Sequence, residues 1–234
     1  MSTSRPLVFL GSNIALTQYV DTCRELGIEV KGIVDSDYHG NIETIDNVPV
    51  IGTEKDINFL MTLAEDCDFF CAVTWTPEDN PVMNRNRKKR HKLINLIDEL
   101  DLPCANLIDP RARVSSNTKF GKGIYVDSFA LIDPNVTVGD FSNIYAFTGV
   151  GHHCKIGRNC VFQRQISITG NITFEDNVFL GTACKVLKSG VTIRDNTFVN
   201  EAIYLKRGTF KDEVVSKDGH NTRRVVHVED MVKA

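Results

Sequence analysis

The sequence predicts a fold in two parts: an α/β, Rossmann-like N-terminal domain at residues 1–105 and a parallel β-helix of hexapeptide repeats at residues 106–210. A C-terminal tail would occupy residues 211–234. Two observations support this division. Before residue 105, short apolar segments alternate with segments of helical spacing, a pattern typical of a parallel sheet with right-handed crossovers. After residue 107, apolar residues recur every six positions, a period that does not suit a helix.

The first part contains four apolar segments that read as strands and three segments that read as helices. The expected strands are Leu7–Gly11, Ile28–Asp35, Val48–Gly52 and Asp68–Thr74, and the expected helices are 14–26, 54–64 and 84–100. Of a G-x-G-x-x-G dinucleotide motif only Gly11 is present, so an NAD site is not expected. The basic run 85–92 reads as a solvated helix face, with phosphate contact as the less favoured alternative.

The second part is defined by its period. Every sixth residue from Ile108 to Val186 is aliphatic or phenylalanine, and after one extra residue the pattern resumes at Ile193. A second apolar or small residue generally follows four positions after each of these anchors. Such a repeat fits a prism in which each of three faces takes one short strand and a coil has about 18 residues. Glycines directly after an anchor, such as Gly151 and Gly157, are expected to serve tight corners.

Composition excludes several classes of function. The net charge of −3 gives no electrostatic case for binding nucleic acid or an anionic membrane. No apolar run approaches the roughly 18 residues of a membrane span, and the apolar run at residues 7–10 is too short for a signal peptide. The seven cysteines lack metal-site spacing, so we expect reduced thiols, no metal and a cytoplasmic location.

Two adjacent histidines, His152 and His153, stand at a predicted corner in the stretch VGHHCKIG. With this motif the chain resembles the acetyl-CoA-dependent, hexapeptide-repeat sugar acetyltransferases, which comprise nucleotide-amino-sugar N-acetyltransferases and sialic acid O-acetyltransferases. The resemblance rests on LVFLGSN, GIVDSD and VPVIGT in the first half, and on VGHHCKIGRNC and GNITFEDNVFLGTACKV in the second. It implies a left-handed β-helix and a homotrimer with acetyl-CoA between neighbouring β-helices. It also implies a sugar nucleotide that reaches the site from the N-terminal domain.

The resemblance also implies roles for individual residues. His152 occupies the position of the general base, and a neutral imidazole with a pKa near 6.5 is a competent base at neutral pH. Gly170 stands where a backbone N–H stabilises the tetrahedral intermediate. The pantetheine arm of CoA would run along Gly181, and its phosphates would meet basic residues of the C-terminal coils: Lys185, Lys188, Arg194, Lys206 and Arg207.

Substrate-side residues follow in the same way. Gly11, Ser12, Asn13 and Asp35 are candidates for holding the sugar nucleotide, with a purely structural N-terminal domain as the alternative; Tyr145 replaces a polar residue on the substrate side of the family's site. Where the family usually has an acid beside the base, this chain has His153. The tautomer of His152 must therefore be set by a backbone carbonyl, a water, an acid of a neighbouring chain, or His153 itself.

Two alternatives remain, and a third, in another class, is set aside. The chain could be a sugar O-acetyltransferase of the sialic acid type, or a catalytically weak binding and scaffolding protein that keeps the fold. A zinc hydrolase on the same fold would need three imidazoles on one metal ion. This β-helix contains two, on adjacent residues, so a metal site is not expected.

Overall fold

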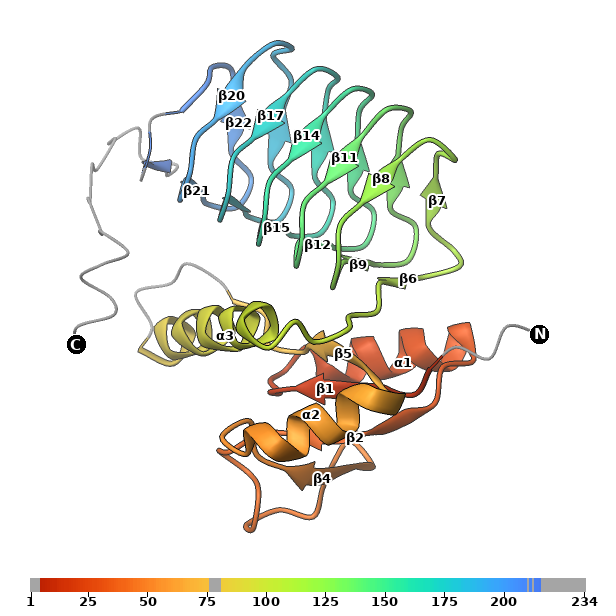
Figure 1. The fold of residues 1–234 in the computed structure, drawn as a ribbon. Coiled ribbons are helices and arrows are strands. Elements are labelled where there is room, and N and C mark those ends of the chain that lie inside the picture. The colour runs from red at the N-terminus through yellow and green to blue at the C-terminus, as the bar shows by residue number, and fades with distance from the viewer. Residues whose placement is uncertain (1–4, 76–80, 210, 212, 216–234) are drawn as a thin grey trace. The chain divides into compact units, whose positions relative to one another are not determined.

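The structure is a computed structural model that describes residues 5–75, 81–209, 211 and 213–215 (Figure 1). The chain divides into two compact units, Met1–Leu107 and Ile108–Ala234. The expected tail at residues 211–234 lies mostly outside the described residues. Among the helices that are described, none combines the length and the apolar character that crossing a membrane requires.

The N-terminal unit is built on one five-stranded sheet of order β3-β4-β2-β1-β5. Four of its strands are parallel, and they lie where the sequence predicts strands: β1 (Leu7–Leu10), β2 (Val30–Val34), β4 (Val48–Gly52) and β5 (Asp68–Cys71). The added strand β3 (Thr44–Ile45) was not expected and pairs antiparallel with β4. It is joined to β4 by Asp46 and Asn47, whose φ angles of 51° and 64° fit a two-residue hairpin turn.

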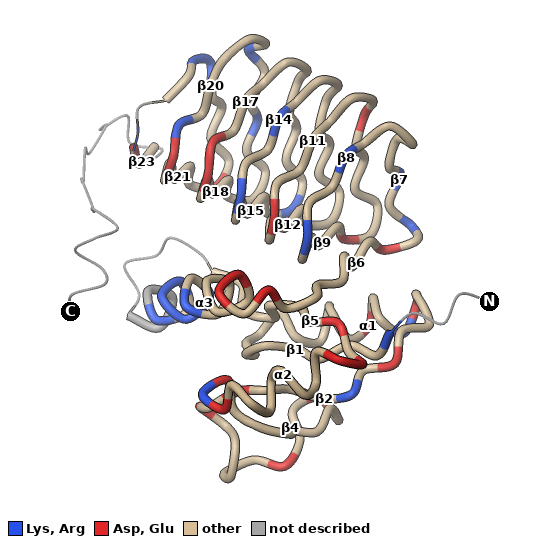
Figure 2. Tube along the Cα trace, viewed as in Figure 1, with Lys and Arg blue, Asp and Glu red and all other residues tan. Residues whose placement is uncertain are grey.

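The unit has three helices: α1 (Leu16–Leu26) connects β1 to β2, α2 (Ile57–Asp66) connects β4 to β5, and α3 (Pro81–Glu99) follows β5. Local chemistry sets their ends. Gly27 closes α1 in the left-handed conformation at φ 67°, and the side chain of Asp56 accepts a hydrogen bond from the Phe59 N–H at the start of α2. Lys and Arg gather in the first half of α3 (Figure 2).

The second unit is a parallel β-helix of two-residue strands arranged in three sheets. We call the sheets face 1, face 2 and face 3. Face 1 contains β7 (Arg113–Val114), β10 (Leu131–Ile132), β13 (Gly149–Val150), β16 (Ser167–Ile168), β19 (Lys185–Val186) and β22 (Tyr204–Leu205). Face 2 contains β8 (Lys119–Phe120), β11 (Thr137–Val138), β14 (Lys155–Ile156), β17 (Thr173–Phe174) and β20 (Thr192–Ile193). Face 3 contains β6 (Leu107–Ile108), β9 (Tyr125–Val126), β12 (Asn143–Ile144), β15 (Val161–Phe162), β18 (Phe179–Leu180), β21 (Phe198–Val199) and β23 (Val214–Val215).

The hexapeptide anchors form the core of this unit, as the sequence predicts. Each anchor is the second residue of a strand, and most are fully buried, for example Val150, Phe162 and Phe174. Two buried hydroxyls of this unit are satisfied by backbone carbonyls of neighbouring coils, whereas the buried hydroxyl of Thr118 has no partner within the described residues. The hydroxyl of Ser142 donates to the carbonyl of Gly157 (2.8 Å), and that of Thr148 donates to the carbonyl of Gln163 (2.7 Å).

The corners correct one expectation about glycine. Left-handed φ angles occur three positions after an anchor, at residues such as Asn135 and His153, and not at the glycines that directly follow an anchor. Those glycines are needed for close packing of the coils instead. A Cβ on Gly151 would lie 2.6 Å from the Gly170 nitrogen, and one on Gly157 would lie 2.7 Å from the Glu175 carbonyl carbon.

Candidate active site

The two histidines lie on the corner between face 1 and face 2, which we call the histidine corner. Hydrogen bonds to the coils on both sides fix their backbone. The N–H of His153 donates to the carbonyl of Pro134 on the preceding coil (3.0 Å), and the carbonyl of His152 accepts from the Asn171 N–H on the following coil (2.9 Å). His153 has a φ of 59°, in the left-handed region. Both side chains are exposed.

The ring of His152 lies directly against Gly170, one coil further on. A Cβ at Gly170 would stand 2.6 Å from Cε1 and 2.7 Å from Nε2 of His152, so a side chain there would force the His152 ring to move. The backbone N–H of Gly170 meets no acceptor within the described residues. At the corner between faces 2 and 3, the equivalent N–H groups of Lys122 and Arg158 donate to Asp140 and Asp176 (2.9 and 2.8 Å). The histidine corner thus pairs an imidazole with an available N–H donor.

His153 is the hydrogen-bond partner of His152. Their Nδ1 atoms are 3.0 Å apart, and the rings meet edge to face with centroids 5.2 Å apart. The other nitrogen of His153, Nε2, lies 3.1 Å from Nδ2 of Asn135. Of the four partners considered for fixing the tautomer, the structure therefore places His153 in contact. Asn135 was missed, although its separation of 18 residues from His153 is a signal that the coil repeat provides.

This arrangement has the parts needed for acyl transfer. An exposed imidazole can accept a proton from a nucleophile, and a nearby backbone N–H can stabilise the negative oxygen that forms when the nucleophile attacks a carbonyl. Both groups belong to hydrogen-bonded coils, so neither has to be ordered during the reaction.

The other residues expected to bind a cofactor are spread over three sides of the β-helix. Lys188 lies on the histidine corner, and Lys206 and Arg207 directly follow the face 1 strand β22. Lys185 is exposed on face 1, and Gly181 follows the face 3 strand β18, where a Cβ would lie 2.5 Å from the Glu201 nitrogen. Arg194 follows the face 2 strand β20 and so lies on a different corner.

Two of these basic residues have acidic partners that the sequence did not indicate. Arg194 is paired with Glu175 at 2.7 Å. Arg207 is paired with the buried Glu213, whose hydrogen bond raises the pKa of the guanidinium against the opposing effect of burial. Lys206 lies over the ring of Tyr204, 5.4 Å from its centroid. Because Arg194 and Arg207 are already paired with glutamates, they attract an anionic ligand less strongly than unpaired arginines would.

Tyr145 is buried and not displayed on the surface. Its ring packs edge to face against Tyr125 with centroids 5.6 Å apart, and Asn143 Nδ2 lies 3.5 Å from its hydroxyl oxygen. A role of Tyr145 toward a substrate stays a prediction.

The N-terminal candidates meet at the carboxyl ends of β1 and β2, with their side chains already engaged. Asp35 is fully buried; its carboxylate accepts from the Ser12 hydroxyl (3.0 Å) and from Lys89 Nζ (2.6 Å). Asn13 donates to the carbonyl of Thr74 (2.7 Å). Gly11 has a φ of 68°, and a Cβ there would lie 2.6 Å from Leu93 and Val73 atoms. Their binding of a substrate stays a prediction.

Lys89 was missed because the basic run 85–92 reads as a solvated face. Its side chain is only 15% exposed, and it bridges Asp35 (2.6 Å) and Asp37 (2.7 Å). Burial lowers the pKa of Lys89, but the hydrogen bonds to both carboxylates outweigh this effect and the pKa is raised. The hydrogen bond from Lys89 in turn lowers the pKa of Asp37. Both groups are therefore charged at neutral pH.

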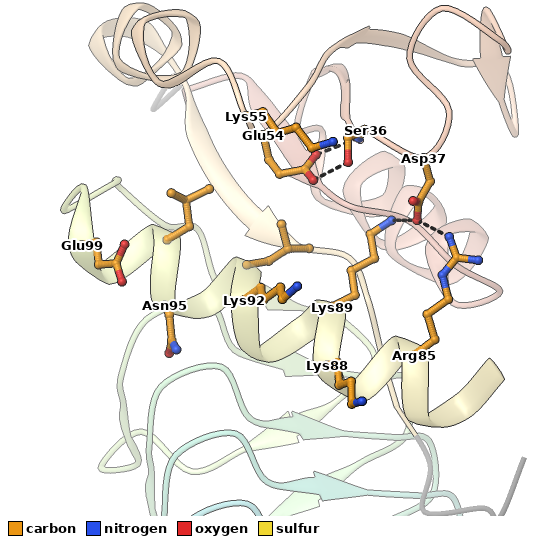
Figure 3. A pocket seen from close by; sticks show the side chains of 12 residues that line it. Ser36, Asp37, Glu54, Lys55, Arg85, Lys88, Lys89, Lys92, Asn95 and Glu99 are labelled. Carbon is orange, nitrogen blue, oxygen red and sulfur yellow. Dashed lines mark hydrogen bonds and ion pairs between the residues drawn. The ribbon is translucent and has the colours of Figure 1, made fainter. Parts of the chain in front are cut away.

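A pocket of about 950 Å³ opens beside this bridge (Figure 3). Its wall includes the α3 residues Arg85, Lys88 and Lys92, together with Lys55 after β4. Two of the three acidic residues that line the pocket have partners: Asp37 also pairs with Arg85 (3.0 Å), and Glu54 accepts from the backbone N–H and the hydroxyl of Ser36 (2.7 and 2.5 Å). Glu99 is the third. The pocket therefore offers cationic groups to an anionic ligand.

Comparison with known proteins identifies relatives of one type. Protein-family models give no match to the sequence. The GDP-perosamine N-acetyltransferase of Escherichia coli O157:H7 is 28% identical over 142 residues, which cover 60% of this chain and 62% of that relative. The match thus spans less than two thirds of the relative's length.

Solved structures match over more of the chain. PerB from Caulobacter crescentus, solved in complex with CoA and GDP-perosamine, is 25% identical; the match covers 89% of this chain and 92% of that one with a TM-score of 0.75. WeeI from Acinetobacter baumannii AYE has the same TM-score at 17% identity, covers 90% of this chain and 96% of its own, and shows the fold alone. These matches confirm the predicted fold class and the resemblance to hexapeptide-repeat sugar acetyltransferases.

The contact between His152 and Gly170 can be tested without any ligand. Gly170→Ala places a methyl group 2.6 Å from Cε1 of His152, so the ring has to move. We expect the imidazole resonances of His152 to shift in NMR spectra of this variant. Gly149→Ala is the matched control, because nothing lies within 4 Å of its added Cβ. Unchanged His152 resonances in G170A would contradict the contact.

Proposed function

We propose that this chain, which is similar to hexapeptide-repeat sugar acetyltransferases, transfers the acetyl group of acetyl-CoA to the amino group of a nucleotide-linked amino sugar. The observation that carries the proposal is the His152 ring packed against Gly170, whose N–H meets no acceptor in the described part of the chain. Support also comes from the comparisons, because the sequence relative is named a GDP-perosamine N-acetyltransferase and PerB was solved with CoA and GDP-perosamine.

The proposed reaction uses these two groups in sequence. The sugar nitrogen attacks the thioester carbonyl carbon while His152 removes a proton from that nitrogen. The Gly170 N–H donates to the oxygen, which becomes negative in the tetrahedral intermediate. The carbon–sulfur bond then breaks, and the thiolate of CoA receives the proton held by His152. The products are an amide and free CoA.

The CoA phosphates are proposed to meet the basic residues of the C-terminal coils. Lys188 and Lys206 are the strongest candidates, because both are exposed and neither has an acidic partner within the described residues. Lys188 lies on the histidine corner, and Lys206 directly follows the face 1 strand β22. Arg194 and Arg207 would contribute while paired with Glu175 and Glu213. Gly181 and Lys185 are proposed to flank the pantetheine arm. The reduced cysteines support a cytoplasmic location.

Replacing His152 tests the proposed base. General-base catalysis typically contributes about 10² to 10⁴-fold, so His152→Ala should lower kcat by about that factor while CoA still raises the melting temperature. His153→Ala should cost about tenfold or less. Turnover is measured with acetyl-CoA and a panel of GDP-, UDP- and dTDP-linked amino sugars and their hydroxyl analogues.

The exposed His39 of the N-terminal unit provides the control for that experiment, since His39→Ala should leave kcat unchanged. Equal losses in the His152 and His153 variants would contradict the assigned roles. If only the hydroxyl sugars were acetylated, the product would be an ester and the chain would be an O-acetyltransferase. Absence of turnover with every acceptor would favour a scaffold function.

The N-terminal pocket is proposed to receive the diphosphate of the sugar nucleotide. Lys92 lines it, is exposed, and has no acidic partner among the described residues. A hydrogen bond from a charged group contributes about 1.5–3 kcal/mol, so Lys92→Ala should raise KM for the sugar nucleotide about tenfold or more without changing KM for acetyl-CoA. Lys31→Ala, at an exposed lysine on β2 outside the pocket, should change neither constant. Equal effects of both variants would refute a specific phosphate contact.

A homotrimer is proposed from the exposed apolar surface of the β-helix. Phe129 and Phe147 are 54% and 59% exposed, and their rings stack at 5.2 Å with an interplanar angle of 11°. Leu131, on face 1, is 42% exposed. Both phenylalanines have φ 60°, a conformation that costs a residue with a side chain about 1–2 kcal/mol. Exposed apolar residues at these two strained positions support a surface that other copies of the chain cover.

Light scattering at micromolar concentration should give the mass of three chains. The double substitution Phe129→Asp and Phe147→Asp should shift the mass toward one chain, because it buries charge in the proposed contact. Met61→Asp, which replaces an apolar residue of α2 that is 46% exposed, should leave the trimer intact. A monomeric wild-type chain would contradict the assembly.

A further inference from the structure

A row of amide side chains leads to the histidine pair along the histidine corner. Asn117, Asn135 and His153 stand 18 residues apart on successive coils, and each contacts the next. We call Asn117 and Asn135 the amide row. Amide nitrogens only donate hydrogen bonds and amide oxygens only accept them. The hydrogen bonds of the row therefore run in one donor-to-acceptor direction, and this direction determines which imidazole nitrogens carry protons.

A backbone group sets this direction at its start. The backbone N–H of Asn135 donates to the Asn117 side chain at 3.1 Å, and an N–H accepts nothing, so the Asn117 atom it meets is the oxygen, Oδ1. The Ser115 hydroxyl donates to the same oxygen at 2.8 Å. The Asn117 nitrogen, Nδ2, therefore faces the Asn135 side chain at 2.7 Å, and the Asn135 atom in that contact must be its oxygen.

The remaining assignments follow from that oxygen. Asn135 directs its Nδ2 at His153 Nε2, 3.1 Å away, so this ring nitrogen accepts and carries no proton. A neutral His153 then holds its proton on Nδ1, which donates to Nδ1 of His152 at 3.0 Å. Since His152 accepts at Nδ1, its own proton lies on Nε2. That is the nitrogen that would otherwise be free to accept the proton of a nucleophile.

We propose that Asn135 is a positioning residue that holds the resting histidine pair in the tautomer in which His152 presents Nε2–H. This inference rests on the proposed function of His152 as base. His152 becomes a base at Nε2 only when the Asn135 amide rotates, so that its oxygen accepts from His153 Nε2–H and His153 Nδ1 accepts from His152 Nδ1–H. The rotation turns two NH₂ groups toward each other in the amide row and so costs one hydrogen bond.

The charged residues around the pair do not supply another partner. Asp133 on the preceding coil and Lys155 on the same coil make no ion pair with either ring within the described structure. On the following coil, Thr169, Gly170 and Asn171 are uncharged. The Cys154 thiol donates to the Thr169 carbonyl at 3.2 Å, and burial raises its pKa, so it stays protonated. The direction of the pair is therefore controlled by the amide row.

Two carboxylate substitutions should reverse this direction. Asn135→Asp offers an acceptor to both Asn117 Nδ2 and His153 Nε2–H. Asn117→Asp acts from one coil further away: its carboxylate accepts from the Asn135 side-chain nitrogen, which turns the Asn135 oxygen toward His153. Asn177→Asp is the matched control, because Asn177 also accepts from an asparagine 18 residues earlier (Asn159, 2.8 Å) on a corner whose described residues include no histidine.

The first readout is the protonation state of each ring nitrogen, measured by NMR on the full chain with ¹⁵N-labelled histidine, at a pH where both rings are neutral. His152→Ala and His153→Ala provide the assignments. In the wild type and in N177D we expect the proton of His152 on Nε2 and that of His153 on Nδ1. In N135D and N117D we expect both to be exchanged. A wild-type His152 with its proton on Nδ1 would overturn the inference, whatever the activity.

The second readout is kinetic. N135D and N117D should raise kcat several-fold with little change in KM, because His152 Nε2 is then free at rest. The acidic limb of the pH profile should move to higher pH, since a carboxylate favours the positively charged pair. A purely structural row would change neither tautomer nor profile, and unchanged values in both variants would refute the positioning role. Reversed tautomers with no turnover in any variant would instead refute the proposed function and leave the tautomer assignment standing.

Discussion

Parallel pairing of strand residues 18 positions apart, such as Val150 with Ile168, holds the second unit together, and the site depends on this spacing. Each coil donates to the next, for example from the Gly151 N–H to the Ile168 carbonyl (2.9 Å). A side chain at one position therefore lies beside the side chain 18 residues later. His152 meets Gly170 for this reason, and Asn135 meets His153. The close packing of coils also excludes a side chain at Gly151, where a Cβ would meet the backbone of the next coil.

A rigid ladder of this kind suits a reaction that needs two groups held at a fixed separation. His152 and the Gly170 N–H are on adjacent coils, and hydrogen bonds to neighbouring coils hold the backbone of the histidine pair. In the N-terminal unit, ion pairs hold the side chains of the candidate site in place. Lys89 holds two carboxylates together at the carboxyl ends of the parallel strands, while Lys92 stays exposed on the pocket wall. The first arrangement suits bond making and the second suits recognition of an anion.

The direction of the amide row shows how a backbone group can control chemistry at a distance. The N–H of Asn135 identifies the oxygen of Asn117, and every later contact in the row follows from that one assignment. In a site with an acid beside the base, a carboxylate accepts a hydrogen bond from an imidazole N–H directly. Here an amide nitrogen stands at the end of the row, and it imposes the opposite direction on the pair.

The sequence by itself determined the architecture and the location of the histidine pair. A period of six in the sequence becomes a regular repeat in space, because each coil is stabilised by its neighbours and anchors such as Val150 and Phe162 must be buried. The tertiary structure alone decided the partners of charged and polar side chains. Lys89 reaches Asp35 across 54 residues, Glu213 engages Arg207, and the short strand β3 joins β4 through a turn. Such contacts depend on which surfaces meet after the chain folds, and no period in the sequence records them. The amide row lies between these cases: its 18-residue spacing is visible in the sequence, but its direction depends on a backbone N–H whose partner only the folded corner supplies.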